Sequence, residues 1–197
     1  MVITDGYSEV PGGRLAAVVT YLEMLERPPH RPVAGMPGLT IRRVEKPELD
    51  WYRRLFRAIG EPWLWFSRLR LSDDELRAII HDPGIEISAL EKDGAAEGLI
   101  ELDFREWPEA ELAFFGVTTA LVGSGAGSLL MAYALEDVWS RGARRFWLHT
   151  CTLDHPKALM FYRKWGFIPY KREIEVAPDP RLTGEMRLDA APQIPVI

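Results

Sequence analysis

The feature that most restricts the fold is a run of alternating glycines, Gly123, Gly125 and Gly127, placed between a predicted strand and a predicted helix. Glycine reaches backbone conformations with positive φ and lets the main chain approach a ligand closely. The N–H groups that begin a helix lack intrahelical partners and lie at the positive end of the helix dipole. Together these properties suit a pyrophosphate, whereas a glycine turn that binds no ligand is the alternative.

Two familiar phosphate-binding motifs do not fit this loop. A Walker A loop requires Gly-Lys-Ser/Thr, but Gly127 is followed directly by Ser128. A Rossmann fingerprint requires GxGxxG spacing and an acidic residue at the end of the next strand. The segment after the predicted helix instead reads Arg144-Arg145-Phe146-Trp147. The sequence therefore excludes both motifs.

From residue 39 onward, strand patterns and helix patterns alternate. The predicted strands are Leu39–Val44, Gly84–Glu91, Glu97–Phe104, Ala110–Val117, Arg145–Cys151, Phe167–Val176 and Leu182–Leu188. The predicted helices are Glu48–Ile59, Ser72–His81, Ser128–Ser140 and His155–Trp165. Ser72 and Glu75 form a capping box, and the turn at Asp93-Gly94 favours antiparallel pairing of its neighbours. This order predicts a mixed α/β, α+β-like fold with one central sheet.

The N-terminal region reads as an extension of that domain. Ile3–Val10 and Leu15–Met24 flank Pro11-Gly12-Gly13, which favours a β-hairpin, and a helix over Arg14–Leu25 is the alternative. A proline-rich linker, Glu26–Gly38, follows. We therefore predict an extension over 1–38, a domain over 39–190 and a tail over 191–197.

Composition restricts the partners. The formal net charge of −5 disfavours nucleic acid, because phosphate binding requires a basic surface. No apolar run approaches the roughly 20 residues that span a bilayer, and the N-terminus lacks the features of a signal peptide. We expect a cytoplasmic protein without a membrane partner. Cys151, the single cysteine, is expected to be a buried strand residue, and no Cys/His cluster has metal-ligand spacing.

Three motifs in order carry a resemblance to the GNAT superfamily of acyl-CoA-dependent N-acyltransferases. Val122–Gly127 resembles the pyrophosphate loop Gln/Arg-x-x-Gly-x-Gly/Ala, and Glu111–Val117 resembles the strand before it. His155–Phe167 is similar to the signature N-x-x-A-x-x-x-Y-x-x-x-G-F. The resemblance implies a mostly antiparallel sheet, splayed at the cofactor site, with flanking helices. It also implies transfer of an acetyl or acyl group from acetyl-CoA to an amine.

The same resemblance implies the cofactor-binding residues. They are Phe115, Gly116, Val117, Val122, Gly123, Ser124, Gly125, Ala126, Gly127, Ser128 and His155. Val122 replaces the usual Gln or Arg, so we expect a site built mostly from backbone N–H groups. His155 replaces the usual Asn and either keeps a hydrogen bond near the ligand or caps the helix, as Asp154 also could.

Acyl transfer to an amine requires a base for the amine and an acid for the leaving thiolate. Glu111 has the position of the general base in histone-acetylating members of the superfamily, and Tyr162 matches the tyrosine that protonates the coenzyme A sulfur in many members. For Glu111 the alternative is a solvated glutamate or an ion-pair partner, with Asp103, Glu101 or Asp154 as other bases or water as a relay. For Tyr162 the alternative is a core aromatic residue.

The remaining features leave the acceptor open. His149 reads as a hydrogen-bonded core residue of its strand. The aromatic residues around Trp63 and Trp65 fall where this superfamily lines its acceptor pocket, but core packing explains them equally well. The partner is then an amine-bearing small molecule or protein, and a homodimer contact through the N-terminal hairpin is an open alternative. A non-catalytic acyl-CoA sensor is the competing function.

Overall fold

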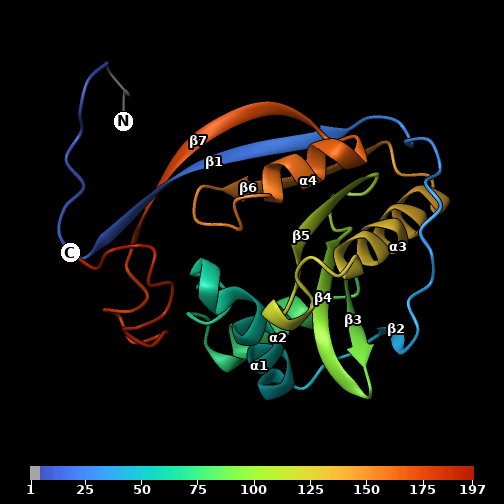
Figure 1. Ribbon diagram of the computed structural model, residues 1–197, viewed down its shortest axis with the longest axis horizontal. Coiled ribbons are helices and arrows are strands. Elements are labelled where there is room, and N and C mark those ends of the chain that lie inside the picture. The colour runs from blue at the N-terminus through green and yellow to red at the C-terminus, as the bar shows by residue number, and fades with distance from the viewer. Residues whose placement is uncertain (1–4) are drawn as a thin grey trace.

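A single seven-stranded sheet organises the chain, as the computed structural model of residues 5–197 shows (Figure 1). The strands are β1 (Arg14–Met24), β2 (Leu39–Arg43), β3 (Ile85–Lys92), β4 (Ala95–Asp103), β5 (Glu109–Val117), β6 (Arg145–Cys151) and β7 (Ile168–Pro178). The helices of this part are α1 (Leu49–Gly60), α2 (Asp73–Ile80), α3 (Ala126–Ser140) and α4 (Ala158–Trp165). The strand order is β2-β3-β4-β5-β6-β1-β7, and every neighbouring pair is antiparallel except β5 and β6. The predicted mixed, mostly antiparallel fold is confirmed.

Two hydrophobic cores lie on opposite faces of the sheet. One forms between the sheet and the pair α3 and α4, with Leu130 and Tyr162 among its buried residues. The other forms beneath α1 and α2, where Tyr52 and Phe56 are fully buried. The capping box is present as predicted, because Ser72 Oγ accepts the N–H of Glu75 at 3.3 Å. The sheet is thus a middle layer between two helical layers.

The predicted N-terminal hairpin is wrong. Residues 5–12 form no strand, whereas Ile3 of the expected first arm lies outside the described residues. β1 instead fills the space between β6 and β7 and pairs antiparallel with both, as the blue strand beside the orange one shows in Figure 1. Its alternate residues Leu15, Ala17 and Val19 are buried, so the helix alternative is wrong as well. A strand bonded on both edges satisfies far more backbone groups than a lone hairpin would. The domain boundary at residue 39 stays a prediction.

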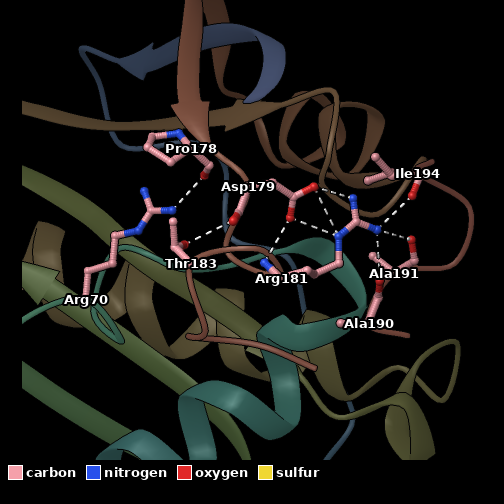
Figure 2. Close-up of polar contacts among 8 residues, drawn as sticks. All are labelled: Arg70, Pro178, Asp179, Arg181, Thr183, Ala190, Ala191 and Ile194. Carbon is pink, nitrogen blue, oxygen red and sulfur yellow. Dashed lines mark hydrogen bonds and ion pairs between the residues drawn. The ribbon is translucent and has the colours of Figure 1, made fainter. Parts of the chain in front are cut away.

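The predicted last strand, Leu182–Leu188, is also wrong. Residues 179–197, here called the C-terminal segment, form turns after β7. The physical reason is Arg181, because its buried guanidinium donates hydrogen bonds to the carbonyl oxygens of Ala190 and Ile194 (Figure 2). A chain that bends round a single side chain cannot remain extended.

Candidate functional site

The parallel strands β5 and β6 separate partway along their length. Their pairing runs from Glu109 opposite Arg145 only to Glu111 opposite Trp147. β5 then continues to Val117 and β6 to Cys151 without pairing to each other. Backbone groups on this open edge of β5 are available to a ligand. Two cavities open at the splay.

The first cavity, here called the glycine-loop cavity, has a volume of about 420 Å³. Nine of the sequence-predicted cofactor residues line it, namely Phe115, Gly116, Val117, Val122, Gly123, Gly125, Gly127, Ser128 and His155. Ser124 and Ala126 do not line the cavity. Ser124 Oγ accepts the N–H of Ala126 at 3.2 Å, and the Ala126 side chain is buried in the core. These two residues hold the loop in place by that hydrogen bond and by packing in the core.

The glycine loop presents backbone donors at the start of α3. Gly123 and Gly125 have φ of +81° and +100°, which residues with a side chain rarely adopt. Among residues 5–197, the N–H groups of Gly123, Gly125 and Gly127 donate to no backbone carbonyl. With the positive end of the α3 dipole behind them, these donors form an anion site. Lys157, which the sequence reasoning missed, adds a cationic side chain to the lining.

The opposite wall of this cavity comes from the residues just before α4 and from the start of that helix. His155 Nδ1 accepts the N–H of Lys157 at 3.0 Å, and its ring lies edge-on to Trp63 with the ring centroids 5.0 Å apart. His155 therefore holds the turn before α4 and also lines the cavity. Asp154 does not cap the helix, because its carboxylate accepts hydrogen bonds from the Cys151 N–H at 2.8 Å and from Trp65 Nε1 at 3.0 Å.

The second cavity, here called the carboxylate cavity, has a volume of about 370 Å³. Its acidic lining residues are Asp103, Glu111, Asp154 and Glu175. Part of its wall comes from the segment between α1 and α2, residues 61–71, here called the aromatic segment. Trp63, Trp65 and Phe66 of this segment all face the cavity. Arg68 and Arg105 line it too, so its four carboxylates exceed its arginines by two, and an aromatic-lined cavity with this negative excess suits a cationic ligand.

The two cavities share part of their walls. Five residues line both, namely Trp63, Trp65, Phe115, Asp154 and Tyr162. The bond between Trp65 and Asp154 joins the aromatic segment to the loop before α4. A group bound in one cavity therefore lies next to a group bound in the other.

Glu111 faces His149 across the splay. The distance from His149 Nδ1 to Glu111 Oε1 is 3.6 Å, and the His149 side chain is 46% exposed. The interpretation of His149 as a core residue was therefore wrong. The nearby carboxylate of Glu111 raises the pKa of His149 above its usual value, although partial burial opposes that rise.

This raised pKa predicts a pH-dependent stability. Because His149 binds its proton more tightly in the folded state, the pair stabilises the fold fully below the unfolded pKa of about 6.5. That contribution is lost as pH rises through the raised folded pKa. We expect the melting temperature of wild type minus that of His149→Gln to shrink as pH rises above about 6.5. Thermal unfolding at several pH values measures the difference, and a difference that grows with pH contradicts the assignment.

Tyr162 stands where the cavities meet. Its ring is 9% exposed and packs edge-on against Phe115 and Phe167. The residue lines both cavities. Burial, with a smaller contribution from Asp154, raises the pKa of Tyr162 well above its usual value. The phenol is thus protonated at neutral pH and is available to donate.

The alternative bases have other partners. Glu101 is fully buried and accepts hydrogen bonds from Tyr52 and Arg68, each at 2.5 Å. It lines neither cavity. Burial raises the pKa of Asp103, but hydrogen bonds from Arg105 outweigh this and lower it below the usual value. Of the two, only Asp103 faces the carboxylate cavity, and it does so as a salt-bridged carboxylate.

The single cysteine is not activated as a nucleophile. Cys151 is half-buried in the carboxylate cavity, and burial raises its pKa to about 11, so it stays a thiol rather than a nucleophilic thiolate.

Within residues 5–197 no group of three His, Cys, Asp or Glu side chains is arranged to hold a metal ion. In the same range, every helix falls short of the length and apolar character needed to cross a membrane.

Comparison with known proteins agrees with this geometry. Residues 49–167 match the model of the "Acetyltransferase (GNAT) family". A GCN5-related N-acetyltransferase from Sphaerobacter thermophilus is similar with a TM-score of 0.62 and 17% identity, covering 84% of this chain and 53% of that one. A conserved protein of unknown function from Staphylococcus epidermidis is similar with a TM-score of 0.55 and 16% identity, covering 85% of this chain and 63% of that one. This chain thus spans between about half and two thirds of the length of those two proteins.

A third solved structure is covered almost completely. The ribosomal-protein-S18-alanine N-acetyltransferase from Escherichia coli gives a TM-score of 0.56 at 15% identity, with 72% of this chain and 94% of that chain covered. At these identities the likeness establishes the fold. No protein with a curated description matches the chain.

Proposed function

Because the chain belongs to the acetyltransferase (GNAT) family, we propose that it transfers an acetyl or acyl group from acyl-CoA to a primary amine. The observation that carries this proposal is the junction of two cavities at the β5–β6 splay, one rich in backbone donors and the other rich in carboxylates. A direct transfer requires both substrates to be bound at once and to meet. Tyr162 lines both cavities and therefore marks the meeting point.

The glycine-loop cavity fits the acyl-CoA substrate. The free N–H groups of Gly123, Gly125 and Gly127 would bind the diphosphate together with the α3 dipole. Lys157 would add a positive charge that Val122 does not provide. The unpaired edge of β5 from Phe115 to Val117 would bind an extended arm by backbone hydrogen bonds.

The carboxylate cavity fits the amine. Glu111, directly or through His149, would accept the proton that an ammonium group must lose before its nitrogen can attack. The new carbon–nitrogen bond forms as the carbon–sulfur bond breaks, and Tyr162 would give its proton to the leaving sulfur. Backbone N–H groups of the open β5 edge would stabilise the oxyanion. The attacking nitrogen loses a second proton when the amide forms; that proton would restore the Tyr162 phenol, and the proton held by Glu111 would pass to solvent.

We expect the glycine loop to decide cofactor binding, and Gly125→Ala tests it. At φ of +100° an alanine raises the free energy of this backbone conformation by roughly 1–2 kcal/mol. The loop therefore shifts, and its N–H groups no longer point at the ligand. We expect acetyl-CoA to bind about tenfold more weakly, measured as the loss of its thermal stabilisation of the protein. The matched control is Gly142→Ala, which has φ of +84° at the other end of α3 and should keep wild-type affinity.

Two results would reject the proposal. Wild-type protein that gains no thermal stability from millimolar acetyl-CoA has no acyl-CoA site. Protein that is stabilised but releases no thiol with a panel of amines is the sensor rather than the enzyme. The acceptor itself is an amine of small-molecule or protein origin, and the homodimer stays a prediction.

A further inference from the structure

The C-terminal segment packs behind the aromatic segment. Met186 and Ala190 are buried in one cluster with Leu64, and Phe66 packs against that cluster. Leu64 and Phe66 also line the carboxylate cavity. The wall of this cavity is therefore two layers thick, and its outer layer comes from the end of the chain.

A buried arginine gives the C-terminal segment its shape (Figure 2). The Arg181 side chain is 1% exposed and pairs with Asp179 at 2.7 Å. Its Nη1 donates to the carbonyl oxygens of Ala190 at 3.2 Å and Ile194 at 2.7 Å. A guanidinium keeps its charge when buried, so it must keep these partners. The segment is thus a defined turn structure rather than a loose tail.

Arg70 connects the two layers. Its Nε donates to Glu185 Oε1 at 3.0 Å, and its Nη2 donates to the carbonyl oxygen of Pro178 at 2.7 Å, the bond drawn in Figure 2. The guanidinium carbon lies 4.0 Å from the centroid of the Phe66 ring. One side chain of the aromatic segment thereby bonds to both the end of β7 and the C-terminal segment, while it supports a residue of the cavity wall.

One further bond joins the same layers, because Gln193 Nε2 donates to the carbonyl oxygen of Pro62 at 2.8 Å. Arg57 of α1, the helix that leads into the aromatic segment, donates from Nη1 to the carbonyl oxygen of Glu185 at 2.6 Å. The aromatic segment is therefore held by the C-terminal segment at both of its ends and through its centre.

We infer that the C-terminal segment positions the aromatic segment and so sets the affinity for the amine acceptor, with Arg70 as the main positioning residue. Residues 179–197 line neither cavity, so they act through the wall and not by contact. They also lie beyond residues 49–167, which match the family model. This inference rests on the proposed function. The acceptor preference of this chain then depends on a part that the family domain does not supply.

The test compares Arg70→Gln with a matched control, Arg77→Gln, whose exposed side chain pairs with Asp74 on the same helix. The full chain is assayed with acetyl-CoA and with the panel amine that gives the fastest wild-type thiol release. We expect the KM for the amine to rise at least about tenfold, because two hydrogen bonds of a charged group are lost. The KM for acetyl-CoA and kcat should stay near wild type, and Arg77→Gln should change nothing.

Hydrogen exchange provides a second readout that needs no substrate. Amides of residues 61–71 should exchange faster in Arg70→Gln and in Glu185→Gln, which removes the same contact from the other side, and those of α3 should not. An unchanged amine KM in folded Arg70→Gln overturns the inference, as does an equal loss for both substrates. If no amine releases thiol from the wild type, the proposed function fails, and the exchange comparison alone decides whether the C-terminal segment holds the aromatic segment.

Discussion

Glu111→Gln should lower kcat by about 10²-fold or more while leaving the fold and acetyl-CoA binding intact. The carboxylate faces the carboxylate cavity and His149 at 3.6 Å, so its loss removes the acceptor for the ammonium proton. General base catalysis contributes roughly 10²–10⁴-fold. Glutamine keeps the size of the side chain but accepts no proton at neutral pH. Thiol release from acetyl-CoA with a saturating amine measures kcat.

The matched control for this variant is Glu109→Gln. Glu109 precedes Glu111 on the same strand by two residues, but it bonds to Arg145 at 2.8 Å and lines neither cavity. We expect near wild-type turnover. If Glu111→Gln also turns over like wild type, the base must be reassigned, and Asp154 is the next carboxylate of the cavity to replace. Because Glu111 lines the carboxylate cavity and not the glycine-loop cavity, acetyl-CoA should stabilise Glu111→Gln as much as it stabilises the wild type.

Tyr162→Phe is the second variant with a large expected effect. Removal of the proton donor for the leaving thiolate should reduce kcat by about 10²-fold. The free energy of unfolding should change little, because the ring keeps its packing against Phe115 and Phe167. A large activity loss without a stability loss separates the acid from the core-aromatic interpretation.

Tyr133→Phe controls for removing a phenol elsewhere. The hydroxyl of Tyr133 lies 3.4 Å from Ser88 Oγ, and the residue lines neither cavity. Its activity should match wild type. Equal activity of Tyr162→Phe and wild type would mean that water or another side chain protonates the thiolate, and the tyrosine would then be a packing residue.

Much of the candidate site could be predicted because its signals are local. Gly123 and Gly125 adopt positive φ, which glycine in a loop before a helix already indicates. Ser72 and Glu75 are three residues apart and form the capping box that their spacing predicts. Tyr162 lies on a short helix that Gly166 ends at φ of +107°, again as a local pattern predicts.

Other site properties depend on which segments meet. Asp154 reads as a helix cap from its neighbours, but Trp65 of the distant aromatic segment donates to it instead. His149 reads as a core residue, yet β5 and β6 separate just beyond Glu111 and leave the imidazole half exposed. Lys157 falls at an unspecified position of the signature motif, so the motif gave no signal for it. The outcomes for Asp154 and His149 depend on partners far along the chain, and side-chain periodicity carries no information about such partners.

The sequence by itself determined the glycine loop, the tyrosine helix and most strands and helices, because backbone preference and periodicity act within a few residues. Only the tertiary structure decided where β1 lies and what the end of the chain does. A strand can pair with any free edge, but the edge of β6 exists only after β6 has joined the sheet, and in the part of the chain that the structure describes β7 is attached to the sheet through β1. In the same way, the turns of the C-terminal segment follow from one buried arginine and the carbonyl groups that surround it.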